Sequence, residues 1–123
     1  MGMRRHYEKS VCGTMLHCEV IEMGRDYTVC LWDEVGGHVG SVCLSAARPS
    51  LTGKGVSATT SVLNCLGHKE EVVAREIAEA VATQKNCTVV CSCGIHLDGI
   101  SPEMIEEILK ACRELKEMIL ASS

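Results

Sequence analysis

The chain has 123 residues, of which 46% are hydrophobic, which suits a single domain spanning residues 1–123 and is too short for two ordinary domains. A formal net charge of −4, one Trp, two Tyr and no Phe argue against nucleic acid as a partner, because basic patches and stacking platforms are missing. No apolar run approaches the ~18 residues that span a bilayer and no signal-peptide core follows the charged N-terminus, so we expect no membrane association and a cytoplasmic location.

The first half of the chain predicts three β-strands after a flexible segment at residues 1–10. Residues 14–21 alternate loosely between apolar and polar side chains, residues 27–32 are rich in β-forming residues, and residues 39–46 complete the series. A tight turn is expected between the first two strands, and Gly36-Gly37 marks the next turn. Consecutive strands with short connections predict an antiparallel meander.

Residues 48–69 interrupt this pattern and are rich in Gly, Ser and Thr. A connection of about twenty residues without secondary structure is uncommon in a compact domain and is usually functional or disordered. We therefore expect a loop that holds a ligand and not a linker.

The second half of the chain predicts a helix, a strand and a second helix. Residues 69–84 place apolar side chains at helical spacing, and residues 88–93 are β-rich. Ser101-Pro102 is typical of a helix start. The order β-β-β-loop-α-β-α predicts an α+β fold in which a mainly antiparallel four-stranded sheet carries two helices on one face. Its uncovered face makes a homodimer plausible.

The chemistry of the middle segment suits an anion such as a phosphate. Gly53 and Gly55 let backbone N–H groups approach a ligand, hydroxyl groups donate hydrogen bonds, and basic side chains supply charge. The spacing is not that of a Walker A loop. A flexible surface loop has the same composition and remains an open alternative.

Three histidines follow glycines at predicted element ends, at His38, His68 and His96. They could bind a metal, contact a ligand, or be unrelated surface residues. Cys91 and Cys93 would share one face of a strand, but no second pair at ligand spacing accompanies them. Most of the nine cysteines lie inside apolar patterns, so we expect reduced, structural thiols and no bound metal.

Several ordered segments of the chain resemble one protein family. They are Arg48-Pro49-Ser50-Leu51, Ser57-Ala58-Thr59-Thr60-Ser61-Val62, Leu66-Gly67-His68-Lys69-Glu70, Gly94-Ile95-His96-Leu97-Asp98 and Ile100-Ser101-Pro102-Glu103. The likeness covers residues 14–118 and is to the prenylated-flavin chaperones, LpdD-like small D subunits associated with gallate and hydroxyarylic-acid decarboxylases of the UbiD type.

The resemblance implies a non-catalytic accessory protein that binds prenylated FMN, or FMN. Such a protein would receive the cofactor from a flavin prenyltransferase and protect it or deliver it to a UbiD-type decarboxylase of aromatic or unsaturated acids. Two alternatives remain open: an enzyme that assists oxidative maturation of the cofactor, and a structural subunit of the decarboxylase complex. The residues expected to bind the phosphate and the ring edge are His38, Arg48, Ser50, Lys54, Ser57, Thr59, Thr60, Ser61, His68, Lys69 and His96.

Overall fold

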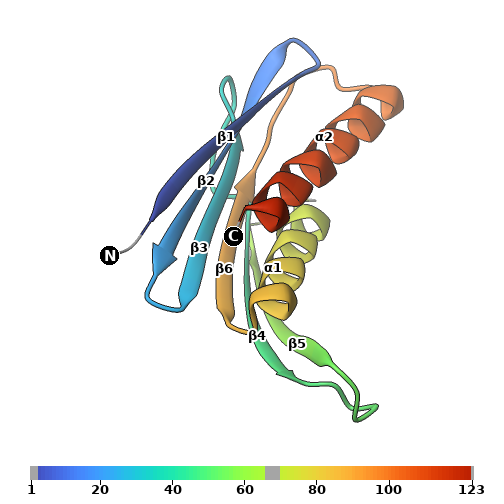
Figure 1. The fold of residues 1–123 in the computed structure, drawn as a ribbon. Coiled ribbons are helices and arrows are strands. Elements are labelled where there is room, and N and C mark those ends of the chain that lie inside the picture. Colours follow the sequence, from blue (N-terminus) through green and yellow to red (C-terminus); the bar gives the residue numbers. More distant parts are fainter. Residues whose placement is uncertain (1–2, 66–69, 123) are drawn as a thin grey trace.

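A computed structural model of the protein describes residues 3–65 and 70–122. These residues form an α+β fold in which one twisted sheet carries both helices on the same side (Figure 1). The elements are, in chain order, β1 (Arg4–Val11), β2 (Thr14–Met23), β3 (Asp26–Asp33), β4 (Ser41–Pro49), β5 (Val56–Asn64), α1 (Glu71–Lys85), β6 (Thr88–Gly94) and α2 (Pro102–Ala121). None of the helices in these two ranges has the length and apolar character needed to cross a membrane.

The sheet has six strands in the order β1-β2-β3-β6-β4-β5, so the predicted four-stranded sheet was wrong. The pair β3 and β6 is parallel and every other pair is antiparallel. The expected meander was also wrong beyond β3, because α1 carries the chain back across the sheet and β6 enters between β3 and β4 (Figure 1). This long-range insertion has no local sequence signal.

Residues 4–11 form a strand, so the flexibility expected of residues 1–10 is wrong for residues 4–10. β1 pairs with β2 around a turn in which Cys12 and Gly13 have φ values of 49° and 74°. Its inward side chains are long and amphipathic: Tyr7 donates a hydrogen bond to Ser122 Oγ at 2.7 Å, and Lys9 Nζ lies 2.9 Å from a Glu114 oxygen. Such side chains cover apolar surface with their aliphatic or aromatic parts and keep their polar ends exposed. The sequence of β1 therefore has few of the apolar residues expected of a strand that packs on a core.

The middle segment is a β-hairpin, so the long loop predicted at residues 48–69 was wrong for its described part. Only residues 50–55 form the turn, in which Gly53 and Gly55 adopt φ values of +80° and +75°. The run Val56–Asn64 contains Ser and Thr that suit a half-exposed edge strand. The Ser and Thr residues that suggested a loop therefore belong to a β-strand.

The other elements confirm their predictions. Ser101 caps α2 by accepting a hydrogen bond from Met104 N at 3.2 Å, and Pro102 occupies the first turn. Helix α1 ends at Lys85, and the φ of 52° at the next residue, Asn86, is typical of a left-handed C-cap. The predicted strands at 14–21, 27–32 and 88–93 correspond to β2, β3 and β6.

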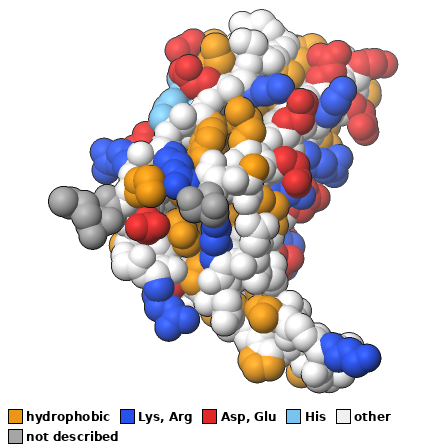
Figure 2. Space-filling model, viewed as in Figure 1, with side chains coloured by type: hydrophobic (Ala, Val, Ile, Leu, Met, Phe, Trp, Pro, Cys, Tyr) orange, Lys and Arg blue, Asp and Glu red, His pale blue; other side chains and the backbone are white. Residues whose placement is uncertain are grey.

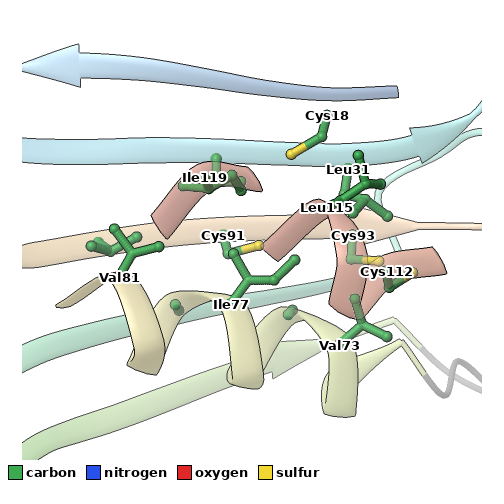
Figure 3. Packing of buried hydrophobic residues seen from close by; sticks show 14 of the residues in the cluster. Cys18, Leu31, Val73, Ile77, Val81, Cys91, Cys93, Cys112, Leu115 and Ile119 are labelled. Carbon is green, nitrogen blue, oxygen red and sulfur yellow. The ribbon is translucent and has the colours of Figure 1, made fainter. Parts of the chain in front are cut away.

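The core between the sheet and the helices is aliphatic and rich in cysteine (Figure 3). Cys91 and Cys93 project from the same face of β6 into this core, and burial raises the pKa of both thiols. Burial also raises the pKa of Cys18 and Cys112 to about 12. These side chains act as small apolar groups that pack against α1 and α2 residues such as Ile77 and Leu115.

We expect the stability of the protein to fall above pH 9. The unfolded chain ionises its thiols near the ordinary value of 9.0, whereas Cys18 and Cys112 keep their protons up to about 12 in the folded state. The folded state then binds more protons, so the free energy of unfolding declines by up to about 1.4 kcal/mol per pH unit for each such thiol. Urea unfolding between about pH 7 and 10.5 measures this slope.

Two cysteine variants isolate the contribution of one buried thiol to that slope. Cys112→Ala should make the decline above pH 9 shallower, because it removes a buried group. Cys65→Ala should leave the slope unchanged, because this cysteine is exposed. Equal slopes for Cys112→Ala and the wild type would contradict the prediction.

Candidate functional site

The structure separates the predicted site residues into two groups: two histidines beyond the start of β4, and hairpin residues that extend from the middle of β4, where Ser61 pairs with Leu44, to beyond its end. His38 and His96 lie near the carboxyl ends of β3 and β6, whereas the residues from Arg48 to Ser61 lie on the β4–β5 hairpin. His68 and Lys69 lie outside the described residues. The nine residues of β4 make eight steps of about 3.3 Å, so its ends are separated by about 26 Å.

The hairpin presents its polar side chains on two different faces. Thr60 points toward α1, where its hydroxyl contacts Glu79 and Ser45. Because side chains alternate along a strand, Ser57, Thr59 and Ser61 lie on the opposite, helix-free face. Arg48 joins them there, and its Nε donates a hydrogen bond to Thr59 Oγ1 at 2.8 Å.

The turn of the hairpin is largely exposed, and Leu51 is its only apolar residue besides the glycines. Ser50 Oγ lies 2.9 Å from Thr52 Oγ1 and accepts a hydrogen bond from the Thr52 N–H at 3.3 Å. Figure 2 shows the hairpin projecting from the body of the protein with a basic side chain near its end, where Lys54 is the only basic residue of the turn. Both elements of the predicted anion-binding chemistry, hydroxyl groups and positive charge, are present on this hairpin.

At the other end of the sheet, a buried carboxylate organises two loop segments. Asp33, the last residue of β3, is fully buried. Its Oδ2 accepts a hydrogen bond from Gly36 N at 2.7 Å, and its Oδ1 accepts one from His96 N at 2.9 Å. Asp33 therefore ties the segment after β3 to the segment after β6.

The glycines in these segments permit close backbone packing. A Cβ atom on Gly94 would lie 1.7 Å from the His38 carbonyl oxygen, and one on Gly36 would lie 2.3 Å from the His96 carbonyl oxygen. The His38 ring is held between the Gly36 carbonyl oxygen, 2.9 Å from Nδ1, and Glu70, 3.5 Å from Nε2. Two of the three glycine-adjacent histidines, His38 and His96, therefore lie at the same end of the sheet.

Beside these segments, the helix-free face of the sheet carries a shallow depression of about 290 Å³. Side chains of β3 and β6, including Cys30, Trp32 and Ser92, line its floor, and Gly37, His38 and Val39 line its side. A mainly apolar hollow with a few polar groups is the usual form of a small-molecule site. Trp32 is the single tryptophan of the chain.

The same face continues from the depression as an apolar surface across β6, β4 and β5. Val90, Leu44 and Ser61 lie side by side on adjacent strands, and Val42 pairs with Leu63 next to them. The side chains of Leu44 and Leu63 are 43% and 74% exposed. A contiguous exposed apolar surface of this kind is typical of binding sites.

Three residues of this end of the protein were not predicted as site residues: Trp32, Asp33 and Glu70. Trp32 had a sequence signal, because it alternates with Thr28 and Cys30 on the polar face of a predicted strand. Asp33 resembles an ordinary turn residue in the sequence, and Glu70 an ordinary first-turn glutamate. Their roles depend on contacts with segments distant in the chain.

The fold places the protein among small α+β proteins whose sheet is covered on one side by two helices. It is similar to a chain in the crystal structure of a chaperone complex for yeast 20S proteasome assembly, with a TM-score of 0.53 and 13% sequence identity. That likeness covers 95% of this chain and 98% of the other, and at this identity it concerns the fold alone. No curated protein sequence matches the chain.

The family is defined by sequence. Residues 10–123 match the prenylated flavin chaperone LpdD-like domain. The chain belongs to this family, which confirms the resemblance based on the segments around Arg48, Ser57 and Gly94.

Proposed function

We propose that this protein is a non-catalytic accessory protein that binds prenylated FMN and protects it or delivers it to a UbiD-type decarboxylase in the cytoplasm. Membership of the prenylated flavin chaperone family supports the ligand class. The observation that carries the location of the site is the depression beside Trp32 on the helix-free face. In this role a flavin prenyltransferase supplies the cofactor, and the cofactor itself performs the chemistry of the decarboxylase.

The flavin ring is proposed to lie in the depression. Trp32 and Cys30 contact its face or edge, and the segment from Gly37 to Val39 forms the side wall. The segment that carries His38 packs closely on β6 at Gly94, so the wall is formed by backbone packing within the fold. A preformed wall reduces the entropy lost on binding.

The ribityl phosphate is proposed to extend across the sheet toward β5. Val90 of β6 lies two strands from Ser61 of β5, a distance of about 10 Å at ordinary strand spacing. Ser61 and Thr59 offer hydroxyl groups on the same face, and Arg48 supplies positive charge beside Thr59. An ionised phosphate favours such charge-assisted hydrogen bonds.

Ser50 and Lys54 are too far along the hairpin to reach the same cofactor within one protomer. We propose that they act in a homodimer that covers the helix-free face, where the projecting hairpin of one protomer extends over its partner. The exposed Leu44 and Leu63 side chains support burial of this face. Light scattering of the purified protein should give the mass of two chains.

The proposed ring site is tested by titration with enzymatically prepared prenylated FMN, followed by flavin absorbance. Trp32→Ala removes the floor of the depression and Ser92→Leu fills it. Each should weaken binding at least about tenfold, or 1.4 kcal/mol. The exposed Lys110→Ala serves as the control and should bind like the wild type.

The phosphate end is tested separately with the double variant Arg48→Ala and Lys54→Ala. Unchanged affinity would place the phosphate elsewhere. Native mass spectrometry of protein from cells that make the cofactor distinguishes the remaining alternatives: no bound flavin would favour a structural subunit. Conversion of excess reduced cofactor by small amounts of protein would favour a maturation enzyme.

A further inference from the structure

Two histidines and a glutamate of the first two strands bring three metal-ligating atoms together on the helix-free face. The antiparallel register places His6 opposite Glu19 and Glu8 opposite His17. His6 Nε2 lies 3.0 Å from His17 Nδ1, which lies 3.3 Å from Glu8 Oε2, and His6 Nε2 lies 3.8 Å from the same carboxylate oxygen. Residues 3–65 and 70–122 contain one such convergence of His, Cys, Asp or Glu atoms, and it is this one.

The spacing of the three atoms matches a metal coordination sphere. A triangle with sides of 3.0, 3.3 and 3.8 Å has a circumscribed circle of about 2.0 Å radius, which equals the Zn–N and Zn–O bond lengths of 2.0–2.2 Å. An ion that replaces the proton shared by the two rings would therefore lie at bonding distance from all three atoms. Two imidazoles and one carboxylate form a ligand set that Zn²⁺ and its neighbours in the first transition row accept.

The outer nitrogens of both rings face further carboxylates. His6 Nδ1 lies 3.3 Å from Glu19 Oε2, and His17 Nε2 lies 3.4 Å from Glu34 Oε1. Carboxylate partners of this kind orient metal-bound histidines and make them better ligands. The His17 ring also stacks on Trp32, with ring centroids 5.4 Å apart and an angle of 22° between the planes. The contacts with Glu34 and Trp32 thus hold His17 in place.

We propose that His6, Glu8 and His17 bind one divalent transition-metal ion such as Zn²⁺. The ion bridges β1 and β2 and keeps its remaining coordination positions toward the uncovered face, where Glu8 is half exposed. The site does not depend on the proposed flavin function, because none of its three ligands lines the depression. Trp32 lies between the two places and reports on the metal site through its contact with His17.

Cobalt provides the most direct test, because Co²⁺ has visible absorption bands and quenches tryptophan fluorescence. Titration of the full-length protein, freed of metal and kept reduced, should show one Co²⁺ per chain, quenching of Trp32 and recovery of the fluorescence when Zn²⁺ displaces the cobalt. Calorimetry with Zn²⁺ should give a dissociation constant in the micromolar range or tighter. Bound Zn²⁺ should also raise the melting temperature.

Matched variants decide which residues are responsible. His6→Gln and Glu8→Gln should each weaken Zn²⁺ binding at least tenfold, and Glu19→Gln should weaken it by a similar factor through the orientation of His6. His96→Gln changes an exposed histidine elsewhere and should bind normally. Circular dichroism checks that each variant is folded.

Three results would overturn the proposal. The first is the absence of stoichiometric binding by the wild type, and the second is undiminished binding by both His6→Gln and Glu8→Gln. The third is a near-ultraviolet thiolate-to-cobalt band that disappears in Cys30→Ser or Cys65→Ser, which would assign the ion to a cysteine.

Discussion

Gly94→Ala is expected to lower the free energy of unfolding by about 3 kcal/mol and to abolish the depression beside Trp32. The new Cβ would lie 1.7 Å from the His38 carbonyl oxygen, and backbone atoms of a packed segment cannot move aside as the end of a flexible side chain can. The segment from Gly37 to Gly40 must therefore leave β6 or the strand must shift. Urea unfolding followed by Trp32 fluorescence measures both the loss of stability and the altered surroundings of the indole.

Gly99→Ala is the matched control for this substitution. Gly99 has a φ of +65° and no atom within 4 Å of its added Cβ, so the change imposes backbone strain without a clash. It should cost about 1 kcal/mol. If Gly94→Ala is no more destabilising than Gly99→Ala, the close packing between β6 and the His38 segment is not a determinant of stability.

Asp33→Ala is expected to cost about 3–4 kcal/mol of folding free energy, because it removes two hydrogen bonds to a buried carboxylate at once. The Gly36 and His96 N–H groups would lose acceptors at 2.7 and 2.9 Å. Asp33→Asn should cost roughly half as much, since the amide retains one acceptor oxygen of similar shape. Chemical denaturation of the three proteins gives the comparison.

Asp98→Ala tests whether this cost is specific to Asp33. Asp98 lies in the loop after β6 and its side chain is exposed, so its removal should change the free energy of unfolding by less than about 0.5 kcal/mol. Equal effects of Asp33→Ala and Asp98→Ala would mean that the buried carboxylate does not hold the two segments together.

The Gly94→Ala and Asp33→Ala variants also help to distinguish residues that hold the site in shape from residues that contact its ligand. Gly94→Ala and Asp33→Ala should weaken flavin binding together with stability, because they displace the wall that carries His38. Ser92→Leu should weaken flavin binding with little loss of stability, because it acts inside the depression. If flavin affinity falls only in variants whose free energy of unfolding also falls, the result would argue against a site at Trp32.

Local sequence signals were sufficient for the elements whose stability depends on near neighbours. Ser101 and Pro102 begin α2 because a cap and a fixed φ act within one turn of the helix. The β-branched run of β6 and the apolar periodicity of α1 identified those elements for the same reason. The family was also accessible from sequence, because several unusual segments occur in a fixed order.

Features that depend on pairing between distant segments were decided by the tertiary structure. β1 and β5 are edge strands with polar, half-exposed side chains, and only their pairing with β2 and β4 makes them strands. The insertion of β6 between β3 and β4 brings His38 and His96 together and leaves Lys54 at the opposite end of β4. The meeting of His6 and His17 depends on the pairing of β1 with β2, and residues 1–10 were expected to be flexible.

The residues of this chain thus carried enough local information for its helices, most of its strands and its family. The sheet order, the hairpin that replaces the expected loop, and the gathering of Trp32, His38 and Asp33 at one end of the sheet came from long-range contacts. The physical reason is that strand pairing and the burial of a carboxylate satisfy hydrogen bonds between residues far apart in the chain. Periodicity and propensity describe only neighbouring residues.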